Sequence, residues 1–163
     1  MNWYAKLMNG IETIIKYIMS VALAIMVFVT VLEVVRRYMF GLSYPWAEEL
    51  VRYLLVWVTF VGGSVAFKTG NMVLLDLVLN YLSNKNKNSL ALITNTVSLA
   101  FLAYLFRYSV KYTFSSVIID QISTGLGVSM LYAYLSVPLG FGLMILFALN
   151  NYPVLINNLR KAG

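Results

Sequence analysis

The stretch EVVRRYMFGLSYPWAEELVRYLLVWVTFVGGSVAFKTGNMVLLD, from Glu33 to Asp76, decides the fold. It places charged residues at the ends of two apolar runs, each long enough to cross a lipid bilayer. A charged side chain in hydrocarbon costs at least about 2.5–3.5 kcal/mol. We therefore expect these charged residues to lie at a membrane boundary, to pair with one another, or both.

The composition of the whole chain indicates an integral membrane protein. Of 163 residues, 61% are hydrophobic and 11% are charged, and the mean hydropathy is +0.80. A soluble domain has about 25% charged residues. The chain has no Cys and no His, which excludes disulfides, thiol chemistry and the usual zinc and haem ligands. The net charge of +6 is spread over the ends of the apolar segments, which is typical of residues that face lipid headgroups. The sequence contains no cluster of Lys and Arg that would indicate a nucleic acid partner.

The apolar runs predict an all-α membrane protein with a single domain, residues 1–163. A spanning helix needs about 20 residues. Four segments meet this length: 14–38, 46–67, 89–112 and 129–150. We expect the first helix to extend back to Trp3. The first holds the apolar run Tyr17–Leu32 without a small-residue cleavage pattern, so we interpret it as a retained signal anchor. Ser43 is the expected N-cap of the second helix, with Pro45 in its first turn.

Between the second and third spans, residues 72–83 predict a short interfacial helix. About twelve helical residues extend only about 18 Å, too little to cross a bilayer. Asp76, Asn80 and Ser83 share one face and leave the others apolar, which is typical of a helix lying on a membrane surface. We expect Asp76 to face headgroups, and Trp46 to anchor the second span at the interface.

The distribution of Lys and Arg predicts the orientation. With a cytoplasmic N-terminus, the inner side receives seven basic residues: Lys6, Lys16, Lys68, Lys85, Lys87, Arg160 and Lys161. The outer side then receives five: Arg36, Arg37, Arg52, Arg107 and Lys111. Four spans and this asymmetry favour two cytoplasmic termini.

Six charged residues around the turn between the first two spans form the candidate site: Glu33, Arg36, Arg37, Glu48, Glu49 and Arg52. Spacings of three and four place Glu33 on one helix face with both Arg36 and Arg37, and Glu48 on one face with Arg52. If the two helices pack as a hairpin, the six side chains can form one ion-pair cluster. An ion or substrate site is one interpretation. A structural cluster that fixes the hairpin or docks a partner is the other, and we favour it because three acids balance three bases.

Small and polar residues within the spans indicate helix packing rather than chemistry. Gly62 and Ala66, and likewise Ser136 and Gly140, are four apart and allow close helix–helix approach. The spans have apolar centres apart from a polar group around Asn95, which leaves little room for a gated pathway in one copy. The sequence offers no nucleophile with its base and no glycine loop that cradles phosphate. We expect no catalytic residue, no metal and no cofactor.

The opening stretch resembles the signature of the small membrane subunit of tripartite ATP-independent periplasmic (TRAP) transporters, the DctQ family. The resemblance rests on these elements: Arg37-Tyr38, Phe40-Gly41, Ser43, Trp46-Ala47-Glu48-Glu49-Leu50, Arg52, Val56-Trp57, Gly62-Gly63, Lys68-x-Gly70 and Asp76. The resemblance implies a subunit of a bacterial inner-membrane importer that is driven by a sodium gradient. This subunit would work with a large DctM-like membrane subunit, which moves as an elevator. A periplasmic binding protein would deliver an organic acid, of the sialic acid or C4-dicarboxylate type, with overall likeness leaning to sialic acid.

Two other functions stay open on the sequence. One is a small four-helix multidrug exporter acting as a homodimer, a class that uses a membrane-embedded Glu in its first helix. Glu33 lies late in its helix beside two arginines, which argues against that role. The other is a membrane assembly protein without transport activity.

Overall fold

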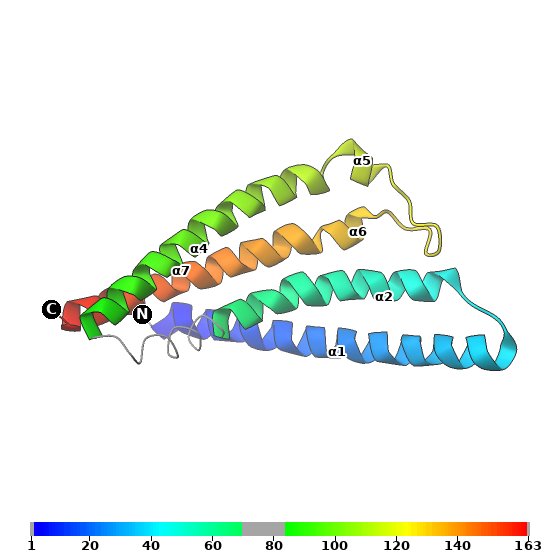
Figure 1. The fold of residues 1–163 in the computed structure, drawn as a ribbon, viewed down its shortest axis with the longest axis horizontal. Coiled ribbons are helices and arrows are strands. Elements are labelled where there is room, and N and C mark those ends of the chain that lie inside the picture. The colour runs from blue at the N-terminus through cyan, green and yellow to red at the C-terminus, as the bar shows by residue number, and fades with distance from the viewer. Residues whose placement is uncertain (1, 70–83, 163) are drawn as a thin grey trace.

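The computed structural model describes residues 2–69 and 84–162, and every regular element in these ranges is helical (Figure 1). The predicted interfacial helix 72–83, with Asp76, lies outside the described residues. The elements are α1 (Asn2–Phe40), α2 (Pro45–Trp57), the π-helix η1 (Val58–Gly62) continued by helical residues 63–69, α4 (Asn84–Thr113), α5 (Ser116–Ile119), α6 (Leu131–Tyr134) and α7 (Ser136–Ala162).

Four helices are long and apolar enough to cross a membrane, which confirms the predicted fold class. They are Lys6–Phe40, Pro45–Thr69, Ser89–Thr113 and Leu131–Asn157. They run alternately up and down, so both termini lie at the same end of the molecule (Figure 1). We call this the terminal end. The opposite end, with the α1–α2 turn 41–44 and the α5–α6 loop 120–130, is called the loop end.

The first helix is much longer than a bilayer requires. Its 39 residues extend about 58 Å at 1.5 Å per residue, against about 30 Å of hydrocarbon. Among the α1 side chains that the structure describes, the buried hydrophobic ones are Met8, Ile15 and Ala22, and none beyond residue 22 is buried. The second half of α1 therefore forms an open edge of the bundle.

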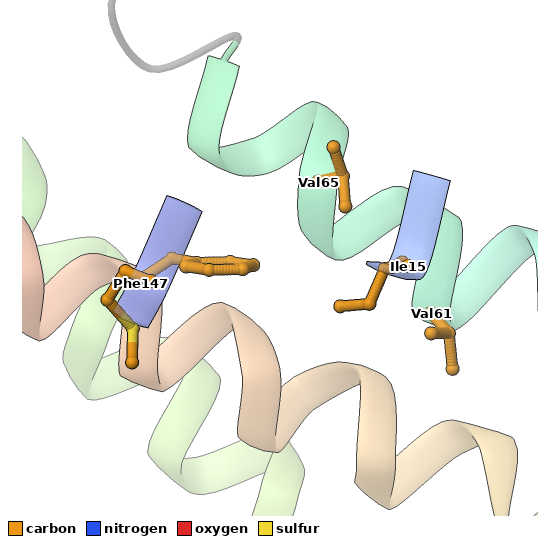
Figure 2. Packing of buried hydrophobic residues seen from close by; sticks show 5 residues of the cluster. Ile15, Val61, Val65 and Phe147 are labelled. Carbon is orange, nitrogen blue, oxygen red and sulfur yellow. The ribbon is translucent and has the colours of Figure 1, made fainter. Parts of the chain in front are cut away.

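The buried core lies toward the terminal end, where three of the long helices meet. Figure 2 shows Ile15 of α1, Val61 and Val65 of the second span and Phe147 of α7 around one interior, which Met8 completes. Phe147 is 1% exposed and Ala148 beside it is fully buried. Because α7 contacts α4, η1 and α1, it is the central helix of the bundle.

Small residues allow α7 to approach the second span closely, as the spacing of Ser136 and Gly140 predicts. A Cβ at Gly140 would lie 2.6 Å from the backbone oxygen of Phe60 in η1, so only glycine fits there. Ser136, one turn earlier, is fully buried. The other predicted pair is less closely packed, because a Cβ at Gly62 would meet Met19 at 3.6 Å and Ala66 is exposed.

Candidate functional site

The six predicted charged residues all lie at the loop end, but they do not form one ion-pair cluster. Among them, the salt bridge within 4.0 Å is Glu48 with Arg52, at 2.7 Å between Oε1 and Nη2. Both side chains are exposed, about 70% each. An exposed pair one helical turn apart adds only about 0.3–0.5 kcal/mol of stability, so this contact does not hold the hairpin together.

Glu33 holds the α1–α2 turn through hydrogen bonds instead of an ion pair. Its Oε1 accepts from the Ser43 hydroxyl at 2.6 Å and from the Tyr44 backbone N–H at 3.0 Å. The prediction of Ser43 as the N-cap of the second helix is therefore wrong. The N-cap is Tyr44, which makes no side-chain cap bond, and the Ser43 hydroxyl is engaged by Glu33. Gly41 makes the turn possible with φ +67°, a conformation that suits glycine.

Arg36 contacts the same turn through a cation–π interaction and not through an ion pair. Its guanidinium carbon lies over the Tyr44 ring, 3.5 Å from the ring centroid. A cation over an aromatic face contributes about 0.5–1 kcal/mol at an exposed site. The Tyr44 ring in turn packs against Trp46, with 5.8 Å between centroids. Glu33 and Arg36 of α1 thus both contact Tyr44 in the turn. Trp46, which packs against Tyr44, has an exposed indole.

Glu49 binds the α5–α6 loop, which sequence reasoning did not connect with it. Its carboxylate accepts from the backbone N–H groups of Gly125 and Leu126, both at 2.9 Å, from the Thr124 hydroxyl at 3.1 Å and from the Ser123 hydroxyl. We call these five residues the Glu49 clamp. Four donors converge on one carboxylate, so its charge is met by hydrogen bonds and not by an arginine.

The packing of the loop agrees with these bonds. A Cβ at Gly125 would lie 2.7 Å from the backbone carbonyl of Pro45, so the loop backbone rests directly on the start of α2. Ser123 is 3% exposed. An antiparallel bridge between Ile122 and Ser129 joins the two sides of the loop, and Gly127 turns it with φ +67°. The local signal in the sequence was the hydroxyl and glycine run from Ser123 to Gly125, but it lies more than 70 positions from Glu49.

A second polar contact, also missed from the sequence, lies at the terminal end. Lys68 is 8% exposed, and its Nζ donates to Glu12 Oε2 at 2.6 Å and to Asn9 Oδ1 at 2.8 Å. It also lies 5.3 Å from the Phe147 ring centroid. Glu12 pairs in addition with Lys16 at 2.5 Å. We call Lys68, Glu12 and Asn9 the Lys68 clamp. It joins α1 to the end of the second span, beside α7.

The polar group predicted around Asn95 joins the last two long helices. Asn95 is 4% exposed, and its Nδ2 donates to the backbone oxygen of Ala148 at 3.2 Å. One residue further along α4, the Thr96 hydroxyl lies 2.9 Å from the Tyr152 hydroxyl. These contacts connect α4 with α7, and they belong to helix packing.

The polar contacts of the described residues join parts of this chain to one another. Within residues 2–69 and 84–162, no three acidic side chains converge where they could hold a metal ion. The Glu49 clamp and the Lys68 clamp each join segments more than 50 positions apart in sequence, whereas Glu48–Arg52 and Glu12–Lys16 are pairs within one helix. The fold and its two clamps define a multi-span helical membrane protein whose charged groups fasten helices and loops to one another.

Comparison with known proteins gives the family. Residues 26–156 match the family model described as "Tripartite ATP-independent periplasmic transporters, DctQ component". This range covers most of the chain, so the chain belongs to the DctQ family of TRAP transporter small subunits, as its resemblance predicts.

Curated relatives agree with this family. The chain is 26% identical over 148 residues to the ectoine TRAP transporter small permease protein TeaB of Halomonas elongata, covering 86% of this chain and 77% of TeaB. It is 34% identical over 77 residues to a putative TRAP transporter small permease protein of Haemophilus influenzae, 47% of this chain and 48% of that protein. It is 25% identical over 99 residues to the isethionate TRAP transporter permease protein DctMQ of Oleidesulfovibrio alaskensis, 61% of this chain and 16% of that protein.

Proposed function

We propose that the chain is an accessory scaffold subunit that packs against the side of a large DctM-like permease in a TRAP importer. The observation that carries this proposal is the open edge of α1. Only 6% of the most apolar 18-residue window of the first span is buried, against 33% in the last span. Large side chains such as Phe28 and Val31 point outward, 64% and 54% exposed. A helix covered so little by its own chain offers a long surface to another membrane subunit.

The remaining parts of the proposed importer are those that the family resemblance implies. A periplasmic binding protein would deliver the substrate, and the large subunit would carry it across by an elevator motion driven by a sodium gradient. The relative named DctMQ supports a large partner, because this chain matches only 16% of its length. We place the chain in the bacterial inner membrane as a single domain, with both termini cytoplasmic. The shared end of the two termini and the excess of Lys and Arg there support this orientation.

The substrate is chosen elsewhere in the assembly, in our proposal. The six charged residues of the candidate site are balanced, three acidic against three basic, so they supply no net positive charge that would select an anionic substrate. Relatives with named substrates are assigned to ectoine and to isethionate. Neither name supports sialic acid as the substrate of this chain, so a substrate of the sialic acid or C4-dicarboxylate type remains a prediction.

Two experiments test the proposal. Co-expression with a DctM-like large subunit should yield a one-to-one complex in detergent, and uptake in vesicles should require both chains and the binding protein. Single cysteines then map the contact, since the chain has no native Cys. A cysteine at Phe28 of α1 should cross-link to the large subunit. The matched control is Phe101 of α4, which is 61% exposed.

The proposal fails if the chain purifies as a homodimer that exports drugs by itself. That exporter would need a free membrane-embedded acid in its first helix, whereas Glu33 bonds to Ser43 and Tyr44. It fails in part if the large subunit cross-links to Phe101 and not to Phe28, because α4 and not α1 would then be the contact helix.

A further inference from the structure

A groove of about 390 Å³ opens between α1 and α2 at the loop end. Its walls combine two kinds of side chain. Glu33, Arg37, Glu48 and Arg52 line its polar part, and Val29 and Val51 line its apolar part. Another groove, of about 400 Å³ between the second span and α6–α7, is apolar apart from Arg52, Tyr53 and Tyr134. Of these two grooves, the α1–α2 groove is the one that combines four charged residues with apolar lining residues.

The depth of this groove matches the boundary of a bilayer. The apolar run Tyr17–Leu32 is about 24 Å long and ends where the groove becomes charged. Arg37 lies beyond this run, whereas Val29 lies about two turns deeper on α1. Arg52 starts deeper on α2, but its side chain reaches back one turn to Glu48, as long basic side chains do toward an interface.

The groove has hydrogen-bond donors to spare. No carboxylate of the described residues lies within 4.0 Å of a nitrogen of Arg37. Arg52 uses Nη2 for Glu48, and a guanidinium has five N–H donors in all. Glu33 Oε1 accepts hydrogen bonds from Ser43 and Tyr44 and makes no salt bridge with Arg37. Two guanidinium groups above an apolar floor suit a phosphate ester that carries a hydrocarbon chain.

We propose that this groove binds one phospholipid molecule. Its phosphate accepts hydrogen bonds from Arg37 and Arg52, and one acyl chain lies along Val29 and Val51. Glu48 is 71% exposed at the mouth of the groove, where it receives the ammonium group of the headgroup. The charges of the lining are balanced, two acidic against two basic, which favours a zwitterionic headgroup with a free amine over an anionic one. The ligand is therefore phosphatidylethanolamine.

The test uses the full chain in nanodiscs of equal parts phosphatidylethanolamine, phosphatidylglycerol and phosphatidylcholine. Native mass spectrometry after release counts and identifies the lipid that each chain retains. We expect one phosphatidylethanolamine per chain, resistant to added inorganic phosphate. Arg37→Gln should lower retention about tenfold, the loss expected for a hydrogen bond between charged groups. Arg107→Gln, which removes an exposed arginine of α4 outside the groove, is the matched control and should change nothing.

A second variant keeps the test decisive if Arg37→Gln does not fold. Glu48→Gln should keep the lipid count at one but remove the preference for phosphatidylethanolamine over phosphatidylcholine. Equal retention in wild type and Arg37→Gln would mean an adventitious lipid only and would overturn the proposal. Retention of phosphatidylglycerol in preference, or displacement of the lipid by inorganic phosphate, would overturn it as well. Because the experiment needs no other subunit, its result is independent of the proposed scaffold role.

Discussion

One charged side chain fastens each end of the helix bundle, and the two side chains have different kinds of hydrogen-bond partner. At the loop end, the Glu49 carboxylate takes hydrogen bonds from a loop, two of them from the backbone N–H groups of Gly125 and Leu126. At the terminal end, the Lys68 ammonium donates to side chains of another helix, Glu12 and Asn9. The first clamp is an anion held by neutral donors, and the second is an ion pair.

The difference follows from what each end can offer. A loop has backbone N–H groups that no helix uses, and such groups must find a partner when they are buried. A carboxylate supplies several acceptor sites at once, so one glutamate satisfies the turn from Ser123 to Leu126. Helical segments such as α1 have few free backbone groups away from their ends. A charge between helices therefore needs a side chain of opposite sign, which Glu12 provides.

The largest effect is expected at the loop end, where one substitution removes four hydrogen bonds. In Glu49→Ala the amides of Gly125 and Leu126 lose their acceptor, so their hydrogen exchange should accelerate strongly. Glu49→Gln keeps one carbonyl oxygen for these amides and should remain close to wild type. Hydrogen–deuterium exchange of the purified protein measures both variants, with α7 amides as the internal reference.

This result would sharpen the contrast between the ends, because it separates hydrogen bonding from charge. Equal acceleration in Glu49→Gln and Glu49→Ala would contradict a clamp held by neutral donors. In that case the negative charge itself would hold the loop, and the two ends would work by the same principle.

The sequence predicts much of the fold because apolar runs of membrane length can hardly form anything except spanning helices. The four spans, the short turn with Pro45 and the closely packed Gly140 all follow from local patterns, and the structure has them. The helical extension of the first span back to Trp3 is also predicted, and α1 begins at Asn2. Polar residues such as Asn9 and Glu12 mark the start of the apolar run but not the start of the helix.

The candidate site was predicted less completely because spacing identifies only partners on one helix. Glu48 and Arg52 are four apart, and they do pair. Glu33 has two arginines at such spacings, yet it bonds to Ser43 and Tyr44, since the turn brings these donors into reach. The partners of Glu49 and Lys68 lie more than 50 positions away, and only tertiary packing brings them together.

A middle-sized effect is expected at the terminal end from Lys68→Met. This change leaves Glu12 without its buried partner, and breaking a buried pair costs about 3–5 kcal/mol. Because Lys16 still pairs with Glu12, we expect the lower limit, about 3 kcal/mol. Lys16→Met is the matched control. It removes the exposed partner of the same carboxylate and should cost only about 0.3–0.5 kcal/mol.

Thermal unfolding in detergent, followed by circular dichroism, compares these two variants. A cost as small for Lys68→Met as for Lys16→Met would show that the Lys68 clamp contributes little. The terminal end would then be held by the core around Phe147 alone, and the comparison of two clamps would fail.

The smallest effect is expected from Asn95→Leu, although Asn95 is more deeply buried than Glu49 or Lys68. Its bond to the Ala148 carbonyl is long, 3.2 Å, and its own Oδ1 is buried without a partner among the described residues. Hydrogen bonds between membrane helices contribute about 0.6 kcal/mol on average. Leucine loses that bond but also removes an unsatisfied oxygen and gains apolar contact with α7, so stability should change by less than about 0.6 kcal/mol.

Asn95→Asp separates the two contributions, because a carboxylate would face the Ala148 carbonyl with no donor and should destabilise the α4–α7 pair clearly. The expected order of thermal stability is Leu equal to or above Asn, with Asp well below both. If Asn95→Leu falls far below wild type, Oδ1 has a partner in the membrane, and the terminal end is fastened at two polar points instead of one.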